Sequence, residues 1–415
     1  MRPKQKYISK TFLLGFFSFW FIFISFTIII GVILSFNLIS TKTNEYISQY
    51  QKLDASAEKV IKSRTLSLFF AKKEGSFQYH GTYGTSWVIP NGVKSENGTL
   101  KCYLATNVHV VSNFINATTN QQKQNIDYSY SLNNNFDCLF LSYFDAKKPQ
   151  IQHGLNVDER EFVQKENIKI LKIFAGQDDD NKYKIEENYI HNNYNDPNNV
   201  PSPFIKNEND NQWYLKNWLH DLAILRLDIT NDNQNLYQFM NNIYENDKNG
   251  QISLIEFNDL ATLKNDIESF YVGGFPYINN KLKWKGYSIP IKDDHFKISS
   301  SIIMDKQFLF RDDINFMLDG KREVFKNISN QILIDDLNIG SGSSGSMLIA
   351  KLKNRDEYKI LGICWGVYEE SNDKKSWEAA DLFISIPKPN AADLPNWEDY
   401  NLVEEMHRII NNDKQ

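Results

Sequence analysis

The sequence predicts an all-β-dominated fold, preceded by an N-terminal segment of a different character. From residue 65 onward the chain contains many short β-rich runs broken by Gly and Asn, among them residues 86–89, 102–105 and 221–227. Many short strands with frequent turn signals favour a sandwich or barrel over an alternating α/β fold. We see no internal repeat and no Pro-rich or Ser-rich linker that would divide the 415 residues into separate folded domains.

The first 40 residues predict a membrane anchor. Arg2, Lys4, Lys6 and Lys10 precede an uncharged, largely apolar run from residue 11 to about residue 40. A membrane-spanning helix needs about 20 apolar residues, and the apolar core of a signal peptide is about 7–15 residues long. The flanking cations favour a cytoplasmic N-terminus, which would place everything after residue 40 outside the cell as a single-pass membrane protein. A cleaved, unusually long signal peptide is the alternative.

The next elements follow from periodicity and composition. Apolar residues at helical spacing predict a juxtamembrane amphipathic helix over residues 41–64. Residues 65–415 form the main predicted domain, and residues 402–410 are typical of a short terminal helix. Three long stretches, partly rich in Asn and Asp, are interpreted as insertions near 115–210, 228–270 and 277–335.

Composition limits the classes of partner. The net charge of −5 and the isoelectric point near 5.9 give no electrostatic footprint for nucleic acid. Cys102, Cys138 and Cys364 are too few for a disulfide framework, and we expect buried free thiols. No CxxC pair or zinc-type ligand spacing is present, and no cofactor is implied.

Three separated segments carry residue types that suit nucleophilic catalysis. His109 lies in Ala-Thr-Asn-Val-His-Val-Val, Asp221 begins the run Asp-Leu-Ala-Ile-Leu-Arg-Leu, and Ser344 lies in Gly-Ser-Ser-Gly-Ser. A serine hydroxyl needs a base to take its proton, and a carboxylate holds the tautomer of that base. Glycines beside the nucleophile let backbone N–H groups approach the reacting carbonyl, and the N–H groups of Gly342 and Ser344 are the expected oxyanion donors.

Each assignment has a simpler alternative. His109 could be a structural histidine, Asp221 a turn cap, and the 342–346 segment a flexible linker. Strand-like residues directly after the segment argue against a linker. His220 cannot supply the negative charge of an orienter, and Asp145 is the fallback for that role. The other candidate nucleophiles in the loop are Ser341, Ser343 and Ser346.

The chain order His, Asp, Ser is that of the chymotrypsin-like double β-barrel proteases. The motifs resemble trypsin-like serine endopeptidases, especially bacterial glutamyl endopeptidases, at 106–110, 274–276, 342–346 and 362–366. Together with Gly-Thr-Ser-Trp at 84–87, they are similar to a mycoplasma surface peptidase family that includes the mycoplasma immunoglobulin protease. This resemblance implies a surface serine endopeptidase that cleaves host proteins, in some members immunoglobulin, together with an immunoglobulin-binding partner protein.

The resemblance also assigns a substrate pocket to Cys364, Trp365 and Gly366. Glutamyl endopeptidases have a histidine where this chain has Cys364, and that histidine helps to bind an acidic P1 side chain. A thiol offers no positive charge, so we expect a P1 preference for neutral residues.

Two other interpretations remain open. Residues 245–256 keep the Gly, the Ile and the final Glu of an EF-hand loop but begin with Glu245. A solvated turn is the alternative to calcium binding there. The second functional hypothesis is a non-catalytic surface binding module, an adhesin or immunoglobulin binder that retains the protease fold.

Overall fold

The computed structural model of the chain describes residues 51–413, with gaps at 75–77, 123–124, 146–147, 149, 155–159, 178–183, 186, 188–189, 191–203, 216, 251, 256–265, 279–280, 291–295, 301–312, 328–329, 336, 338, 354–356, 370–375 and 383–401. The expected anchor, residues 1–40, lies outside the described residues. Within the described part, no helix combines the length and apolar character needed to cross a membrane.

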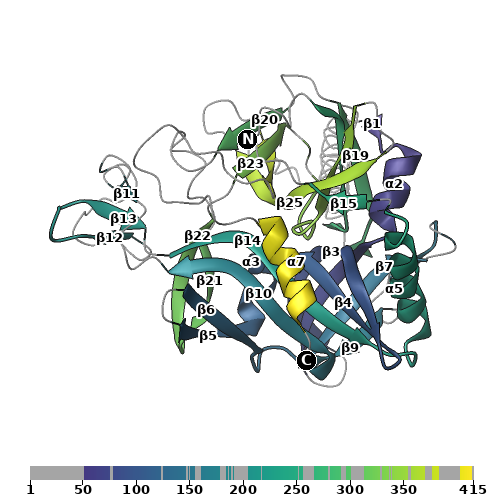
Figure 1. The fold of residues 1–415 in the computed structure, drawn as a ribbon, viewed down its shortest axis with the longest axis horizontal. Coiled ribbons are helices and arrows are strands. Elements are labelled where there is room, and N and C mark those ends of the chain that lie inside the picture. Colours follow the sequence, from purple (N-terminus) through teal and green to yellow (C-terminus); the bar gives the residue numbers. More distant parts are fainter. Residues whose placement is uncertain are drawn as a thin grey trace, which may run out of the picture. The chain divides into compact units, whose positions relative to one another are not determined.

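The predicted dominance of β-structure is confirmed (Figure 1). Twelve described strands form one sheet, called here the first sheet, in the order β6-β5-β21-β22-β14-β4-β3-β2-β7-β8, with β10 beside β14 and β9 beside β7. Its strands are β2 (Thr65–Glu74), β3 (Gln78–Glu96), β4 (Thr99–Thr106), β5 (Ile115–Gln122), β6 (Asn125–Leu132), β7 (Cys138–Phe144), β8 (Gln152–His153), β9 (Glu161–Gln164), β10 (Ile168–Gln177), β14 (Asn217–Ile229), β21 (Asp313–Leu318) and β22 (Lys321–Asn327).

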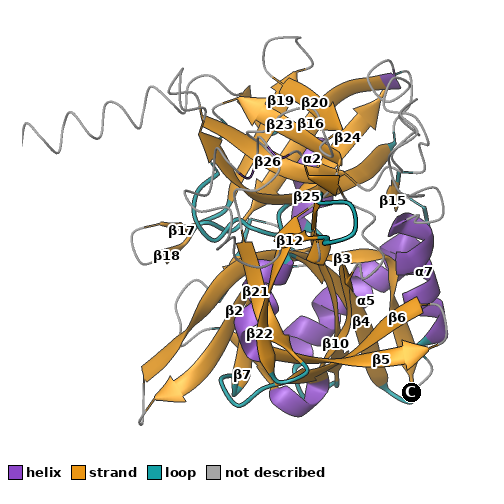
Figure 2. Cartoon of the chain, turned by 90° about the vertical axis from the view of Figure 1, so that its left-hand side faces the viewer, coloured by secondary structure: helices purple, strands orange, loops and turns teal. Residues whose placement is uncertain are grey.

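The second sheet has the order β1-β19-β16-β24-β25-β26-β23-β20, with β15 beside β25, and its first strand is β1 (Gln51–Lys52). Its strands are β15 (Ile252–Leu254), β16 (Ile267–Gly274), β19 (Lys285–Pro290), β20 (Phe296–Ser300), β23 (Asn330–Asp335), β24 (Met347–Leu352), β25 (Tyr358–Glu369) and β26 (Ser376–Leu382). Figure 2 shows this sheet in the upper half of the view and the first sheet in the lower half. Among the described strands, neither sheet closes on itself through its end strands.

The remaining strands are short. They are β11 (Lys184–Ile185), β12 (Phe204–Lys206), β13 (Trp213–Leu215), β17 (Tyr277–Ile278) and β18 (Lys281–Leu282). Strands β11, β13 and β12 form a small separate sheet, and β17 pairs with β18 in a hairpin.

Four α-helices are described: α2 (Ala55–Lys62), α3 (Val108–Val111), α5 (Gln234–Asp247) and α7 (Leu402–Asn412), together with the 3-10 turns η1 (Ser112–Phe114) and η3 (Lys165–Asn167). The expected terminal helix is confirmed as α7. In the described part of 41–64, helix extends only over α2, and its N-cap Asp54 accepts a hydrogen bond from the Ser56 N–H at 2.7 Å. Gln51–Lys52 is strand instead of the expected helix.

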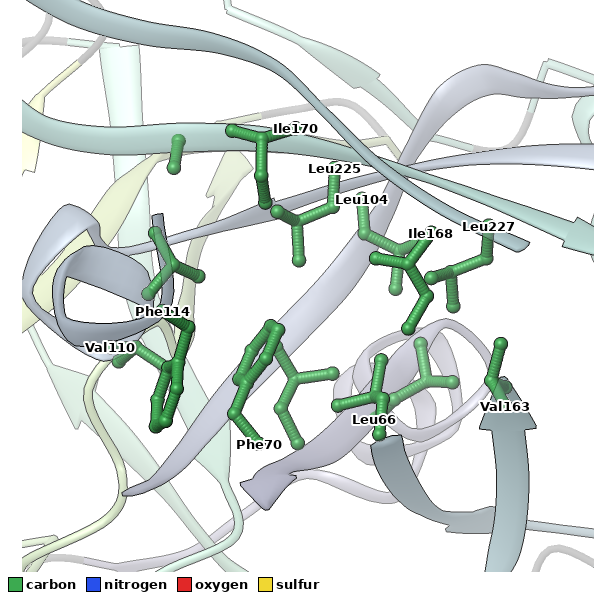
Figure 3. Packing of buried hydrophobic residues seen from close by; sticks show 14 of the residues in the cluster. Leu66, Phe70, Leu104, Val110, Phe114, Val163, Ile168, Ile170, Leu225 and Leu227 are labelled. Carbon is green, nitrogen blue, oxygen red and sulfur yellow. The ribbon is translucent and has the colours of Figure 1, made fainter. Parts of the chain in front are cut away.

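The first sheet buries a large apolar core on one face, shown in Figure 3. Leu104 of β4, Leu225 of β14 and Ile170 of β10 meet there. The rings of Phe70 and Phe114 stack with centroids 5.5 Å apart. Helix α5 closes this core with its buried side chains Leu236, Phe239, Met240 and Ile243.

The other face of the same strands packs in a second core that includes residues of the second sheet. Tyr103 of β4 and Ile224 of β14 share it with Ile349 of β24. Side chains alternate between the two faces of a strand, so β4 and β14 need apolar residues at successive positions because both faces are buried. Helix α7 joins this second core through Leu402, Val403, Met406 and Ile410.

The ranges interpreted as insertions contribute strands to both sheets. Strand β7 is buried along its whole length and pairs with β2, and β10 pairs with β14. Strands β21 and β22 come from the third range and join the first sheet, whereas β19, β20 and β23 join the second. These stretches therefore build the scaffold as well as the connections between its strands.

Candidate active site

His109 projects from α3, the short helix that follows β4. Val108, Val110 and Val111 of this helix are buried in the core of the first sheet. The remaining residue, His109, keeps 34% of its side chain exposed. The apolar residues around the histidine fix the helix against the core and leave the imidazole facing outward.

Asp221 holds His109 with both carboxylate oxygens. The His109 Nδ1 and the Asp221 Oδ2 lie 2.5 Å apart, and the His109 backbone N–H donates to Oδ1 at 3.1 Å. Asp221 is fully buried. A carboxylate can only accept, so the proton of the ring lies on Nδ1 and Nε2 is left as the basic nitrogen. The structure therefore brings together the predicted base and its predicted orienter.

Strand pairing explains why residues so far apart in sequence meet. Strand β14 runs antiparallel to β4 with Ala223 opposite Thr106, so Asp221 lies beyond the end of β4, where α3 begins. The Asn107 amide Nδ2 donates to the backbone carbonyl of Asp221 at 2.5 Å. Asn107 thus connects α3 to β14, a role that sequence reasoning missed although the Thr-Asn-x-His motif contains the residue.

Ser344 lies on a tight loop between β23 and β24. Gly340, Gly342 and Gly345 of this loop have φ angles of 109°, 88° and 94°, a region that favours glycine. A Cβ on Gly345 would lie 1.9 Å from the backbone oxygen of Thr85. Ser344 Oγ donates to the carbonyl of Trp365 at 3.4 Å, near the outer limit for a hydrogen bond.

The Ser344 loop packs against the middle of β3 and the end of β4. The Thr85 N–H donates to the Ser344 carbonyl at 2.7 Å. Thr106 Oγ1 donates to the Thr85 carbonyl at 2.8 Å and lies 2.9 Å from where a Cβ on Gly345 would be. Thr106 is three residues before His109, so the loop and α3 meet at the same end of β4.

The backbone N–H groups of Gly342 and Ser344 are the expected oxyanion donors. Within the described part of the chain, neither the Gly342 N–H nor the Ser344 N–H donates a hydrogen bond. The other loop serines differ from Ser344. Ser343 Oγ donates to the Gly340 carbonyl and Ser346 Oγ to the Ser343 carbonyl, each at 2.6 Å, and Ser341 is exposed.

The fallback orienter Asp145 lies elsewhere. It follows β7, accepts a hydrogen bond from the Lys148 N–H at 2.7 Å, and its Oδ2 lies 3.1 Å from His153 Nε2. Asp145 thus pairs with a different histidine.

His220 is buried and remains neutral, which excludes it as a cationic or titrating partner near neutral pH. Desolvation lowers the pKa of His220 from 6.5 to about 3. Between these two values the unfolded chain binds the proton and the folded chain does not, so stability should fall as the pH decreases from about 6.5 toward 3. We expect a slope of up to about 1.4 kcal/mol per pH unit.

Urea unfolding of the chain truncated before residue 52, measured at pH 7.5, 6.0 and 5.0, checks this prediction. His220→Gln should make the pH dependence shallower. Equal slopes for the variant and the parent chain would contradict it.

The residues of the expected substrate pocket lie on β25 beside the Ser344 loop. The Cys364 N–H donates to the Ser346 carbonyl at 2.9 Å, and the Gly345 N–H donates to the Cys364 carbonyl at 2.8 Å. The pairing of β25 with β26 is irregular between Cys364 and Gly366. The side chains of Cys364 and Trp365 are buried. All three cysteines are buried free thiols, as predicted.

The EF-hand-like segment begins in the last turn of α5, and its residues 251 and 256 lie outside the described part of the chain. Helix α5 ends at Asp247, a turn follows, and β15 begins at Ile252. The Asp247 carboxylate pairs with the buried Arg64 and accepts the Asn91 N–H at 2.8 Å. The described residues contain no group of three or more His, Cys, Asp or Glu that could hold a metal ion.

Comparison with known proteins gives three findings. A family model described as mycoplasma immunoglobulin protease matches residues 55–366. A lipoprotein of Mycoplasma capricolum subsp. capricolum is 32% identical over 89 residues, which is 20% of this chain and 13% of that protein's length. A chain in a solved structure of the mycoplasma MIB and MIP proteins has a TM-score of 0.42 and 15% identity, covering 75% of this chain and 54% of that one.

Proposed function

The chain belongs to the mycoplasma immunoglobulin protease family, and on this premise we propose that it is a serine endopeptidase that acts outside the cell on host proteins. The observation that carries the proposal is the double contact of His109 with the fully buried Asp221. A carboxylate that accepts hydrogen bonds from both the backbone N–H and the ring of one histidine orients that ring for proton transfer.

The reaction would begin with attack of Ser344 Oγ on a peptide carbonyl. The weak hydrogen bond from Ser344 Oγ to the Trp365 carbonyl would break, and the hydroxyl proton would pass to His109 Nε2. His109 would then return the proton to the leaving amine, and Asp221 would stabilise the imidazolium in between. Hydrolysis of the acyl-enzyme would repeat the proton transfer with water.

The N–H groups of Gly342 and Ser344 would stabilise the negative oxygen that develops in the transition state. Donors that are already in place cost little reorganisation at the moment of reaction. The absence of competing acceptors for these two groups in the described part of the chain supports this role.

The proposed architecture is the double β-barrel of the chymotrypsin-like proteases. The first sheet would correspond to the barrel that supplies His109 and Asp221, and the second sheet to the barrel that supplies Ser344. The proposal is supported by the position of α3 directly after β4 of the first sheet and of the Ser344 loop directly before β24 of the second sheet.

The substrate and the location of the protein are also proposals. Immunoglobulin as the substrate follows from the family description. We propose in addition that a separate immunoglobulin-binding protein would present it to the enzyme. The apolar run before residue 40 would anchor the chain as a single-pass protein with the peptidase domain at the cell surface. The alternative is a binding module that does not cleave its ligand. It does not explain why Asp221 orients the His109 ring.

Cleavage of a peptide library and of intact IgG by the full chain in detergent tests the proposal. We expect turnover with neutral residues at P1, since Cys364 brings no positive charge to the pocket. Cleavage mainly after Glu would overturn the predicted P1 preference. No cleavage of any peptide or protein would favour the binding module.

A further inference from the structure

We propose that the buried hydroxyls of Thr85 and Ser346 are positioning residues for the oxyanion hole. This inference rests on the proposed peptidase function. Both residues are fully buried, and neither would touch the substrate. Their hydroxyls hydrogen-bond to backbone carbonyls of the Ser344 loop and thereby set the direction of the N–H groups that carry the chemistry.

Ser346 orients the Ser344 N–H. The Ser343 carbonyl and the Ser344 N–H belong to one planar peptide unit, in which the C=O and N–H bonds point in opposite directions. The Ser343 carbonyl accepts from Ser346 Oγ at 2.6 Å and from the Ser346 N–H at 2.9 Å. Because the carbonyl is held on the Ser346 side, the Ser344 N–H must point away from it.

Thr85 and the backbone of Tyr277 act together on the Gly342 side. The peptide unit that carries the Gly342 N–H is held through the Ser341 carbonyl, which accepts the Tyr277 N–H at 2.8 Å. The carbonyl of the next unit, that of Gly342, accepts from Thr85 Oγ1 at 3.2 Å. Both sides of the Gly342 α-carbon are therefore fixed.

The direction of the Thr85 bonds is determined by chemistry. Thr85 Oγ1 accepts the Phe275 N–H at 3.0 Å, and an N–H can only donate. The single hydroxyl proton is thus available for the Gly342 carbonyl, which can only accept. Thr85 in β3 connects the end of β16 to the loop through this one oxygen.

Close packing supports the same role. A Cβ on Gly274 would lie 1.9 Å from Ser346 Oγ and 3.1 Å from Thr85 Oγ1, so the two hydroxyls occupy the space that glycine leaves. The loop itself is permissive, because glycines at positive φ can adopt several backbone conformations. External hydrogen bonds are needed to select the one in which both donors face the substrate.

The test compares Thr85→Val, Thr85→Ser and Ser346→Ala in the full chain in detergent. We expect Thr85→Val and Ser346→Ala each to lower kcat about 10-fold or more, less than the roughly 100- to 1,000-fold loss of a direct oxyanion donor. KM should change little, and the affinity for a peptide aldehyde, which forms a tetrahedral adduct, should fall in parallel with kcat/KM. Thr85→Ser, which keeps the hydroxyl, should retain activity.

Ser142→Ala is the matched control, because Ser142 Oγ is also buried and donates to a carbonyl, that of Gly154, at 2.6 Å in β7. It should leave kcat and aldehyde affinity unchanged. If Thr85→Val does not fold, the loss of kcat and of aldehyde affinity in Ser346→Ala still tests the proposal. The positioning role would be overturned if Thr85→Val and Ser346→Ala kept the same kcat and aldehyde affinity as Ser142→Ala. It would also be overturned if Thr85→Ser lost as much kcat as Thr85→Val. Either result would leave the proposed peptidase function standing. An inactive parent chain would overturn the proposed function and the positioning role with it.

Discussion

Replacing Ser344 by alanine is expected to abolish peptide hydrolysis, with a fall in kcat on the order of 10⁴- to 10⁶-fold. Without the Ser344 hydroxyl no side chain of the proposed set can attack the peptide carbonyl, and water would have to attack it directly. Folding should be unaffected, since in the described part of the chain Ser344 Oγ makes one long hydrogen bond, to the Trp365 carbonyl. The measurement is kcat on a fluorogenic peptide found in the library, with thermal unfolding as the check on folding.

Ser341→Ala provides the matched control for this substitution. Ser341 lies in the same loop, is exposed, and contributes its backbone carbonyl to the loop structure. Its activity should stay within about twofold of the parent chain, as for an ordinary surface substitution. Retention of more than a tenth of the activity in Ser344→Ala would remove Ser344 from the nucleophile role.

Replacing Asp221 by asparagine should lower kcat by about 10⁴-fold, the effect of losing the orienting carboxylate in a triad of this kind. An asparagine side chain has one accepting oxygen, whereas Asp221 accepts from both the backbone N–H and the Nδ1 of His109. The amide NH₂ would favour the wrong tautomer and place the ring proton on Nε2. The base would then have no lone pair for Ser344.

Asp319→Asn is a control with the same hydrogen-bond chemistry. Asp319 also accepts two bonds from one residue, the Thr119 N–H at 2.9 Å and Thr119 Oγ1 at 2.6 Å, but in the turn between β21 and β22. Its kcat should be unchanged. A small loss in Asp221→Asn, comparable to that in Asp319→Asn, would mean that Asp221 only supports the fold.

Much of the candidate site could be predicted because its residues sit in short, distinctive sequence contexts. His109 follows an apolar strand, and the valines beside it in sequence are buried. Ser344 has glycines on both sides in the loop, as a tight turn requires. The terminal helix α7 and the buried thiols followed from periodicity and cysteine number in the same way.

The supporting residues could not be predicted because their roles depend on long-range contacts. Nothing around Thr85 in the sequence indicates that its hydroxyl lies between Phe275 and Gly342. Ser346 is a candidate nucleophile by sequence, and its complete burial and its donation to the Ser343 carbonyl distinguish it from Ser344. Such roles depend on three-dimensional contacts and not on local pattern.

The insertions were harder to interpret for a related reason. Asn-rich and Asp-rich segments recur within residues 115–210, between strands such as β7 and β10 that pair with β2 and β14. A strand buried on both faces is a short apolar run without alternation, and periodicity alone cannot assign it to a sheet. Strand order in a sheet with crossovers is set by tertiary contacts.

The central claim is that Ser344 is a nucleophile activated by His109. Labelling of the full chain with a fluorophosphonate probe, followed by mass spectrometry of the modified peptide, tests it most directly. The account predicts one modified residue, Ser344, and loss of the label in His109→Ala. No labelling, labelling of a different serine, or undiminished labelling in His109→Ala would contradict it.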